Sequence, residues 1–104
     1  MYSNEAWLPC TVTPGQFSCE YAVQGRTSSG LSFSLFAFEF DLELPHRRSD
    51  MNLPIAGQIR VQILETRDSL ALVRLPQSTL ENGDTVTVNR SDLVMRPSLA
   101  ESCQ

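Results

Sequence analysis

Residues 59–75 read IRVQILETRDSLALVRL. On both sides of a polar centre, apolar residues occupy every second position, including Val61 in the first half and Val73 in the second. A period of two is typical of a strand with one buried face, and the polar centre is typical of a turn. The stretch therefore predicts an antiparallel hairpin. Val61 and Val73 face the same core only if paired residue numbers add up to an even value, which predicts a loop of about three residues.

Three further segments outside this hairpin have the pattern of strands, namely residues 17–23, 31–44 and 85–88. In the first, polar or small residues alternate with larger ones, which places Cys19 on the inward face as a small core residue. The last alternates threonine with valine after the turn signal Asn82-Gly83. Together with the two strands of the hairpin, these segments predict a mainly β, antiparallel fold with five strands.

The segment 31–44 is the most apolar part of the chain, but its apolar residues do not keep one parity. Phe33 and Leu35 fall on one face, whereas Phe36, Phe38 and Phe40 fall on the other. A regular strand keeps its buried side chains on one face, so a β-bulge near Leu35 and Phe36 would reconcile the two halves. Part of the segment also fits helical spacing. The four phenylalanines within a few residues favour the strand.

The remaining segments define the predicted domain boundaries. Residues 1–16 show little periodicity and are expected to form a loosely ordered arm that Trp7 fastens to the domain. Residues 45–58 contain prolines, a glycine and charged residues, which predicts a long loop. A tight turn around Ser91 is expected to place Leu93 against the core. We therefore expect a β-barrel domain over residues 17–95 and a frayed tail over residues 96–104.

The rhythm of five short strands, a tight central hairpin and a closing Val86-x-Val88 followed by Leu93 resembles the small SH3-like barrels. This group includes the Tudor-like and KOW-like modules, and the resemblance covers roughly residues 17–95. It implies a five-stranded SH3-like barrel, with an OB-like barrel as the alternative. The chain lacks the aromatic peptide groove of true SH3 domains and the basic loop of KOW modules, so neither ligand class is carried over.

Composition narrows the possible functions. The chain has a net charge of −4, and all eight basic residues are arginine. An acidic chain fits nucleic acid poorly, because phosphate contacts need a basic face. The three cysteines are Cys10, Cys19 and Cys103, and they show no metal-ligand or disulfide spacing. We expect no cofactor and no metal. Without a signal-peptide pattern or a long apolar stretch, we expect a cytoplasmic protein with no membrane contact.

Two arginines are the first candidate site. The alternation places Arg60 and Arg74 on the outward face of the hairpin, either directly opposite or diagonal to each other. Two like charges across a ladder repel, so a negative group is expected between them. It could belong to a partner protein or come from within the chain, where Glu39, Asp41 and Glu43 share one face. Those carboxylates are too widely spaced along a strand for a metal site.

The phenylalanines are the second candidate site. A domain this small buries one face of each strand, so Phe36, Phe38 and Phe40 are either buried through a bulge or exposed as an interface for a partner or a second copy. His46, the one histidine, has no activating partner in the pattern, and we expect no enzymatic activity. The sequence thus predicts a non-enzymatic protein-interaction module of unknown partner, with a second copy of the chain as one candidate partner.

The alternative hypothesis is a small barrel associated with nucleic acid. It requires several arginines to gather on one face despite the acidic total, and the candidates are Arg60, Arg67, Arg74 and Arg90.

Overall fold

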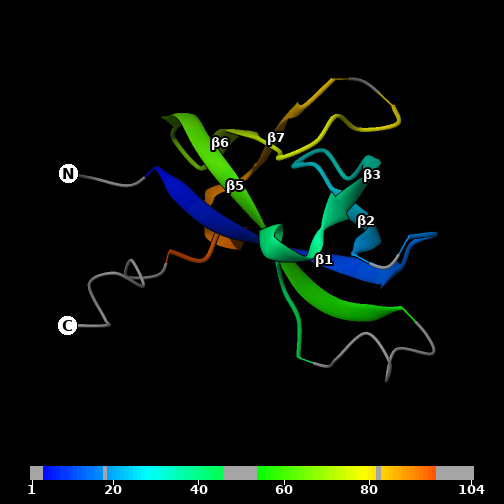
Figure 1. The fold of residues 1–104 in the computed structure, drawn as a ribbon. Helices are drawn as coiled ribbons and strands as arrows, with labels where there is room; N and C mark the ends of the chain where they lie inside the picture. The colour runs from blue at the N-terminus through cyan, green and yellow to red at the C-terminus, as the bar shows by residue number, and fades with distance from the viewer. Residues whose placement is uncertain (1–3, 18, 46–53, 82, 96–104) are drawn as a thin grey trace, which may run out of the picture.

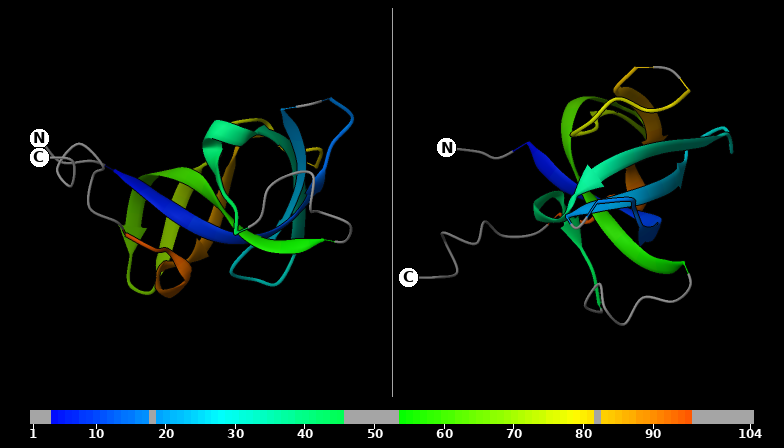
Figure 2. Two further views of the ribbon diagram at one scale, coloured as in Figure 1. Left: turned by 60° about the horizontal axis from the view of Figure 1, so that its bottom comes forward. Right: turned by 45° about the vertical axis from the view of Figure 1, so that its right-hand side comes forward.

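The structure, a computed structural model, describes residues 4–17, 19–45, 54–81 and 83–95. These residues form one antiparallel sheet that curls into a half-barrel (Figures 1 and 2). Its strands are β1 (Glu5–Pro14), β2 (Glu20–Arg26), β3 (Ser32–Phe38), β4 (Leu42–Glu43), β5 (Ile55–Arg67), β6 (Leu70–Arg74) and β7 (Thr85–Asn89). Two short 3-10 turns, η1 (Glu39–Asp41) and η3 (Arg90–Asp92), follow β3 and β7. The prediction of a mainly β, antiparallel fold is confirmed.

The strand order is β3-β2-β1-β5-β6-β7, and β4 pairs with β5 beside this path. The described sheet therefore has seven strands, where the sequence predicted five. The two strands that were not predicted are β1 and the two-residue β4. Both pair with β5, which is the longest strand.

The central hairpin is formed by β5 and β6, and its shared core face is confirmed. Val61 and Val73 are both buried, and the pair Ile63 and Val73 has the even sum that this requires. The predicted three-residue loop is wrong. The register shifts between Ile63 and Glu65, so the ladder ends on the pair Arg67 and Leu70 with a two-residue turn. A bulge absorbs the odd residue, as bulges do in antiparallel pairs.

The expected loosely ordered arm over residues 1–16 is wrong for residues 5–14. These residues form β1, which lies between β2 and β5 in the sheet (Figure 1). Its buried side chains are Ala6, Leu8, Cys10 and Val12, which is a period of two. Proline is tolerated at position 9 because β1 pairs there with β5 alone, its pairs with β2 beginning at Thr11.

Trp7 is part of β1, and its backbone pairs with Val94. The backbone N–H of Trp7 donates to the carbonyl of Val94, and the backbone N–H of Val94 donates to the carbonyl of Trp7. The tight turn expected around Ser91 is η3, and Leu93 packs against the core as predicted. The predicted loop 45–58 is shorter than expected, because residues 55–58 already belong to β5. Most of that loop and the predicted tail 96–104 lie outside the described residues.

The phenylalanine-rich segment forms a regular strand followed by a turn. β3 pairs with β2 without a register shift, so the predicted bulge at Leu35 and Phe36 is wrong, and so is the helical alternative. Phe33, Leu35 and Ala37 are buried. The parity changes in η1 instead, which brings Asp41 and Leu42 to the inside.

The core gathers the inward side chains of all the longer strands: Ala6, Leu8, Cys10, Val12, Tyr21, Val23, Phe33, Leu35, Ala37, Leu42, Ile59, Val61, Ala71, Val73, Leu75 and Val88. The expectation that Cys19 is a core residue is wrong, since it is exposed. β2 begins at Glu20, three residues after the predicted start at Phe17, and the backbone N–H of Glu20 donates to the carbonyl of Phe17.

Gly25 is a position where the core leaves no room for a side chain. A Cβ at this residue would lie 2.5 Å from Cζ of Phe33, its neighbour on β3. We expect Gly25→Ala to lower the free energy of unfolding by about 1–3 kcal/mol, because a buried ring has to move. Urea denaturation measures the change. The double variant Gly25→Ala, Phe33→Leu should recover part of the loss, whereas additive losses would contradict the proposed clash.

Candidate functional site

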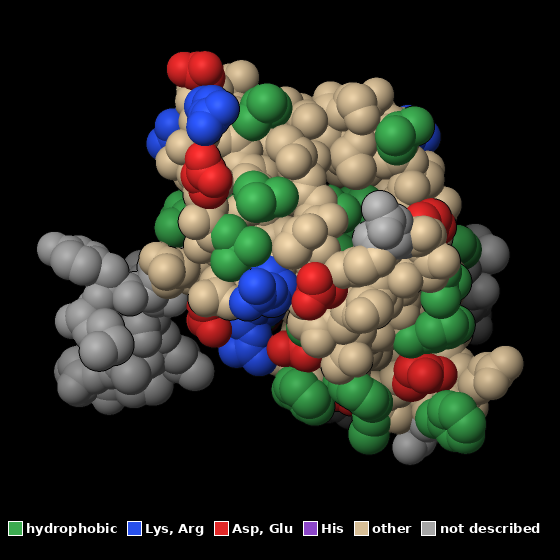
Figure 3. Space-filling model, turned by 90° about the horizontal axis from the view of Figure 1, so that it is seen from above, with side chains coloured by type: hydrophobic (Ala, Val, Ile, Leu, Met, Phe, Trp, Pro, Cys, Tyr) green, Lys and Arg blue, Asp and Glu red, His purple; other side chains and the backbone are tan. Residues whose placement is uncertain are grey.

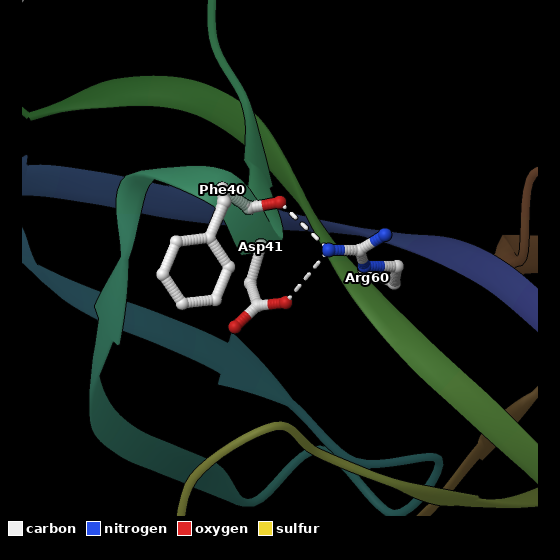
Figure 4. Close-up of polar contacts among 3 residues, drawn as sticks. All are labelled: Phe40, Asp41 and Arg60. Carbon is white, nitrogen blue, oxygen red and sulfur yellow. Dashed lines mark hydrogen bonds and ion pairs between the residues drawn. The ribbon is translucent and has the colours of Figure 1, made fainter. Parts of the chain in front are cut away.

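Arg60 joins three parts of the structure. Its Nη2 donates to the carbonyl of Phe40 at 2.8 Å and to Oδ1 of Asp41 at 3.0 Å (Figure 4). Its guanidinium also lies over the ring of Trp7, 5.9 Å from the centroid. The arginine of β5 therefore holds η1 against the sheet and contacts β1. Planar guanidinium groups suit this role, because they donate in several directions and stack on aromatic faces.

The negative group expected near the arginines comes from within the chain. Of the three acidic residues considered, Asp41 pairs with Arg60, whereas Glu39 and Glu43 are exposed. Asp41 is 8% exposed, and its pairing compensates for the desolvation of its carboxylate. Arg60 thus has a counter-charge within the chain.

Arg74 is in a different environment. It lies opposite Gln62, so it is diagonal to Arg60 rather than directly across the ladder. Its side chain is 51% exposed, and its Nε is 3.9 Å from Oδ2 of Asp84. An exposed ion pair at this distance contributes little to stability. Arg74 therefore keeps most of its capacity to donate hydrogen bonds to another molecule.

The two arginines line one open groove of about 610 Å³, as the sequence predicted them to lie on one surface. Glu5, Asp41 and Asp84 also line it, so the groove carries three carboxylates against two guanidinium groups. Basic and acidic side chains lie close together on the face seen in Figure 3, with apolar side chains beside them. This mixture of charges favours a polar protein surface over an inorganic anion as the ligand.

The phenylalanines form an exposed strip beside the groove. Phe36 and Phe38 are each 41% exposed, and Phe40 is 71% exposed. The rings of Phe38 and Phe40 stack with their centroids 5.6 Å apart. The carbonyl of Phe40 accepts a hydrogen bond from Arg60, and Arg60 lines the groove. These phenylalanines therefore lie next to the groove. We call Phe36, Phe38 and Phe40 the aromatic strip.

Sequence patterns pointed to the arginines, Asp41 and the phenylalanines but missed two acidic residues of the groove, Glu5 and Asp84. Glu5 was assigned to an arm, and Asp84 follows a turn signal without any pattern of its own. No local signal could have found them, because folding brings together residues that lie far apart in the chain. The pairing of Asp41 with Arg60 had a signal, namely the shared face of the acidic residues.

The described residues bear on two of the other chemistries considered. Among the described residues, no group of histidine, cysteine and acidic side chains could hold a metal ion. His46 lies outside these residues. The arginines considered for nucleic acid already contact acceptors of the chain: Arg67 lies 3.4 Å from Glu65, and Arg90 donates to the carbonyl of Asp68.

In the part of the chain that the structure describes, no helix has the length and apolar character needed to span a membrane. No protein-family model matches this chain, and neither a curated protein nor a solved structure shows significant similarity to it.

Substitution of Arg60 tests whether its hydrogen bonds to Phe40 and Asp41 stabilise the fold. We expect Arg60→Met to lower the free energy of unfolding by about 2 kcal/mol, because it leaves the Asp41 carboxylate without its counter-charge. The matched variant Arg74→Met removes an exposed, distant pair and should change stability by less than about 0.5 kcal/mol. Urea denaturation of both variants provides the comparison, and equal losses would contradict the structural role of Arg60.

Burial raises the pKa of the Cys10 thiol from its ordinary value of 9.0 to about 12. We expect iodoacetamide at neutral pH to modify the exposed Cys19 and to leave Cys10 unmodified until the chain is unfolded. The same shift makes stability fall as the pH rises from 9 towards 12, because only the unfolded chain then ionises Cys10. Peptide mapping by mass spectrometry locates the label, and equal labelling of both thiols in the folded protein would contradict this.

Proposed function

We propose that this domain is a non-enzymatic protein-interaction module that binds its partner through the aromatic strip, with Arg74 at the edge of the contact. The observation that carries the proposal is the outward position of Phe36 and Phe38 on β3, whose opposite face belongs to the core, together with the exposed Phe40 in η1. Large aromatic side chains are the residues that contribute most to protein interfaces when they become buried.

Packing within the chain does not explain the exposure of the strip. Leu35 and Ala37 alternate with Phe36 and Phe38 and fill the core from the same strand, so the phenylalanines are not needed there. Solvated positions of a strand usually carry polar residues, since one face of an antiparallel sheet contacts water. Phe36 and Phe38 at such positions, with the exposed Phe40 next to them in η1, favour a surface that a partner covers.

The groove could add polar contacts to those of the aromatic strip. Arg74 is half exposed and only weakly paired with Asp84, so its guanidinium can donate to a carboxylate or a carbonyl of the partner. Arg60 contributes indirectly, because its contacts with Phe40 and Asp41 hold η1 in place. We also assign the half-barrel to the SH3-like class, with an OB-like barrel as the alternative.

The test is site-specific photo-crosslinking in lysate of the native organism. A photoreactive phenylalanine analogue replaces Phe40 in one variant and Leu70 in the control, since Leu70 is an exposed apolar residue of the separate β5–β6 hairpin. We expect one defined protein to crosslink through position 40 and not through position 70. Phe38→Ser should remove this crosslink, because the strip loses a stacked ring.

Other outcomes would contradict the proposal. Equal crosslinking from both positions would show non-specific adhesion. Crosslinks to nucleic acid, lost at high salt, would favour the alternative of a nucleic-acid-associated barrel. A binding loss in Arg74→Ser without any loss in Phe38→Ser would move the contact from the strip to the groove.

A further inference from the structure

The aromatic strip is accessible from the outer face of the sheet and not along its edge. Leu35 pairs with Thr79, and the N–H of Leu80 donates to the carbonyl of Ser34 at 2.7 Å. The chain's own residues 76–79 therefore run along the side of β3 that faces away from β2. The rings of the strip nevertheless remain exposed. A partner of the strip thus contacts side chains and not the backbone of β3.

The outer face of the β2–β3 hairpin is apolar around the strip. Ala22 lies opposite Phe36, and Glu20 lies opposite Phe38. Paired residues of antiparallel strands are neighbours on the same face, and the methyl group of an alanine covers little of a ring. Phe40 continues the surface, because its ring stacks on that of Phe38. The exposed rings therefore form one connected apolar surface.

Carboxylates surround this apolar surface. Glu20 shares its face, Glu39 lies between the last two phenylalanines in the chain, and Glu81 accepts the N–H of Ser34 at the other end. We call these three glutamates the acidic border. Arg60, the basic residue that contacts the strip, already has a counter-charge. Such a surface complements a basic partner and repels nucleic acid and anionic membranes.

The geometry of the strip favours a helical partner. A docking segment finds no backbone partner on the face of a strand, so its own buried N–H and carbonyl groups need internal hydrogen bonds, as in an α-helix. Phe36 and Phe38 are about 6.6 Å apart along the strand, and the rings of Phe38 and Phe40 are 5.6 Å apart. Helix residues seven positions apart are separated by about 10.5 Å, so two turns cover the strip.

We propose that the aromatic strip and its acidic border bind an amphipathic, basic α-helix of a partner protein, which lies across the outer face of the β2–β3 hairpin. This inference rests on the proposed function and specifies its partner. The apolar face of the helix packs on the phenylalanine rings. Lysine or arginine side chains beside that face extend along the rings to Glu20, Glu39 and Glu81.

A second copy of this chain fits the strip less well. Two copies that meet through their strips would bring their acidic borders together, and like charges across an interface oppose binding. The elements of residues 4–17, 19–45, 54–81 and 83–95 are strands and short 3-10 turns. These residues of a second copy therefore supply no α-helix for the strip.

The test measures binding of the full chain to the labelled peptide Lys-Leu-Ala-Lys-Leu-Leu-Ala-Lys-Leu-Ala-Lys-Leu-Leu-Lys, whose leucines share one face of a helix. One control peptide has glutamate in place of every lysine. The other has proline in place of the middle alanine, which breaks the helix. We expect the lysine peptide to bind at least about tenfold more tightly than either control in fluorescence anisotropy. Equal binding of the glutamate or the proline peptide would overturn the proposal.

Substitutions in the protein locate the contact. Glu39→Gln removes one charge of the acidic border, and Glu65→Gln is the matched control on the separate β5–β6 hairpin. We expect Glu39→Gln to weaken the lysine peptide about two- to fivefold and Glu65→Gln to leave it unchanged. Phe38→Ser should weaken it about tenfold or more, because a stacked ring is lost. Equal effects of the two glutamine variants would overturn the role of the acidic border.

The outcomes distinguish this inference from the proposed function. If position 40 crosslinks to one defined protein while the lysine peptide binds no better than its controls, the basic helix is wrong and the aromatic strip remains the contact. If the crosslink is absent as well, the proposed function fails with it. Self-association that grows with protein concentration and is lost in Phe38→Ser would make a second copy the occupant and overturn the basic-helix proposal.

Discussion

The backbone pairing of β5 is the constraint on which the rest of the structure depends. Its first part pairs with β1, and its second part pairs with β6, so the strand connects the two halves of the sheet. Gln62 pairs with both neighbouring strands, with Glu5 of β1 on one side and Arg74 of β6 on the other. The register shift after Ile63 allows the second half to turn away, because a bulge increases the local bend and twist of a strand. The half-barrel follows from this long, bent strand.

Arg60 extends this constraint to the surface. It belongs to β5, and its hydrogen bonds to Phe40 and Asp41 hold η1 where the phenylalanine-rich segment leaves β3. Because η1 changes the parity, Leu42 returns to the core while Phe40 stays outside. The side chain of Arg60 lines the groove and also contacts Phe40 of the aromatic strip. It therefore belongs both to the packing of η1 and to the candidate site. Arg60, which the sequence offered as a partner contact, also has an internal partner in Asp41.

The candidate site was therefore predictable in part. Alternation placed Phe36 and Phe38 on one face and Arg60 and Arg74 on one surface, and the structure has them so. Pairing of Arg60 with an acidic residue of the phenylalanine-rich segment was also foreseeable. That Asp41 is the partner was not, because the strand pattern gave no sign of the 3-10 turn that directs it inward. The position of β3 at the end of the strand order was equally hidden, since an edge exists only relative to the other strands.

The sequence by itself determined the inward residues of most of the strands that it predicted, Cys19 being an exception, since alternation is a property of the extended backbone and needs no partner. It also determined that Val61 and Val73 share a core and that an all-β domain results. Only the tertiary structure decided that residues 5–14 form a central strand and that β3 lies at an edge. Pairing between β1 and β5 joins segments separated by some fifty residues, and its energy comes from hydrogen bonds and burial that exist only after the chain has folded.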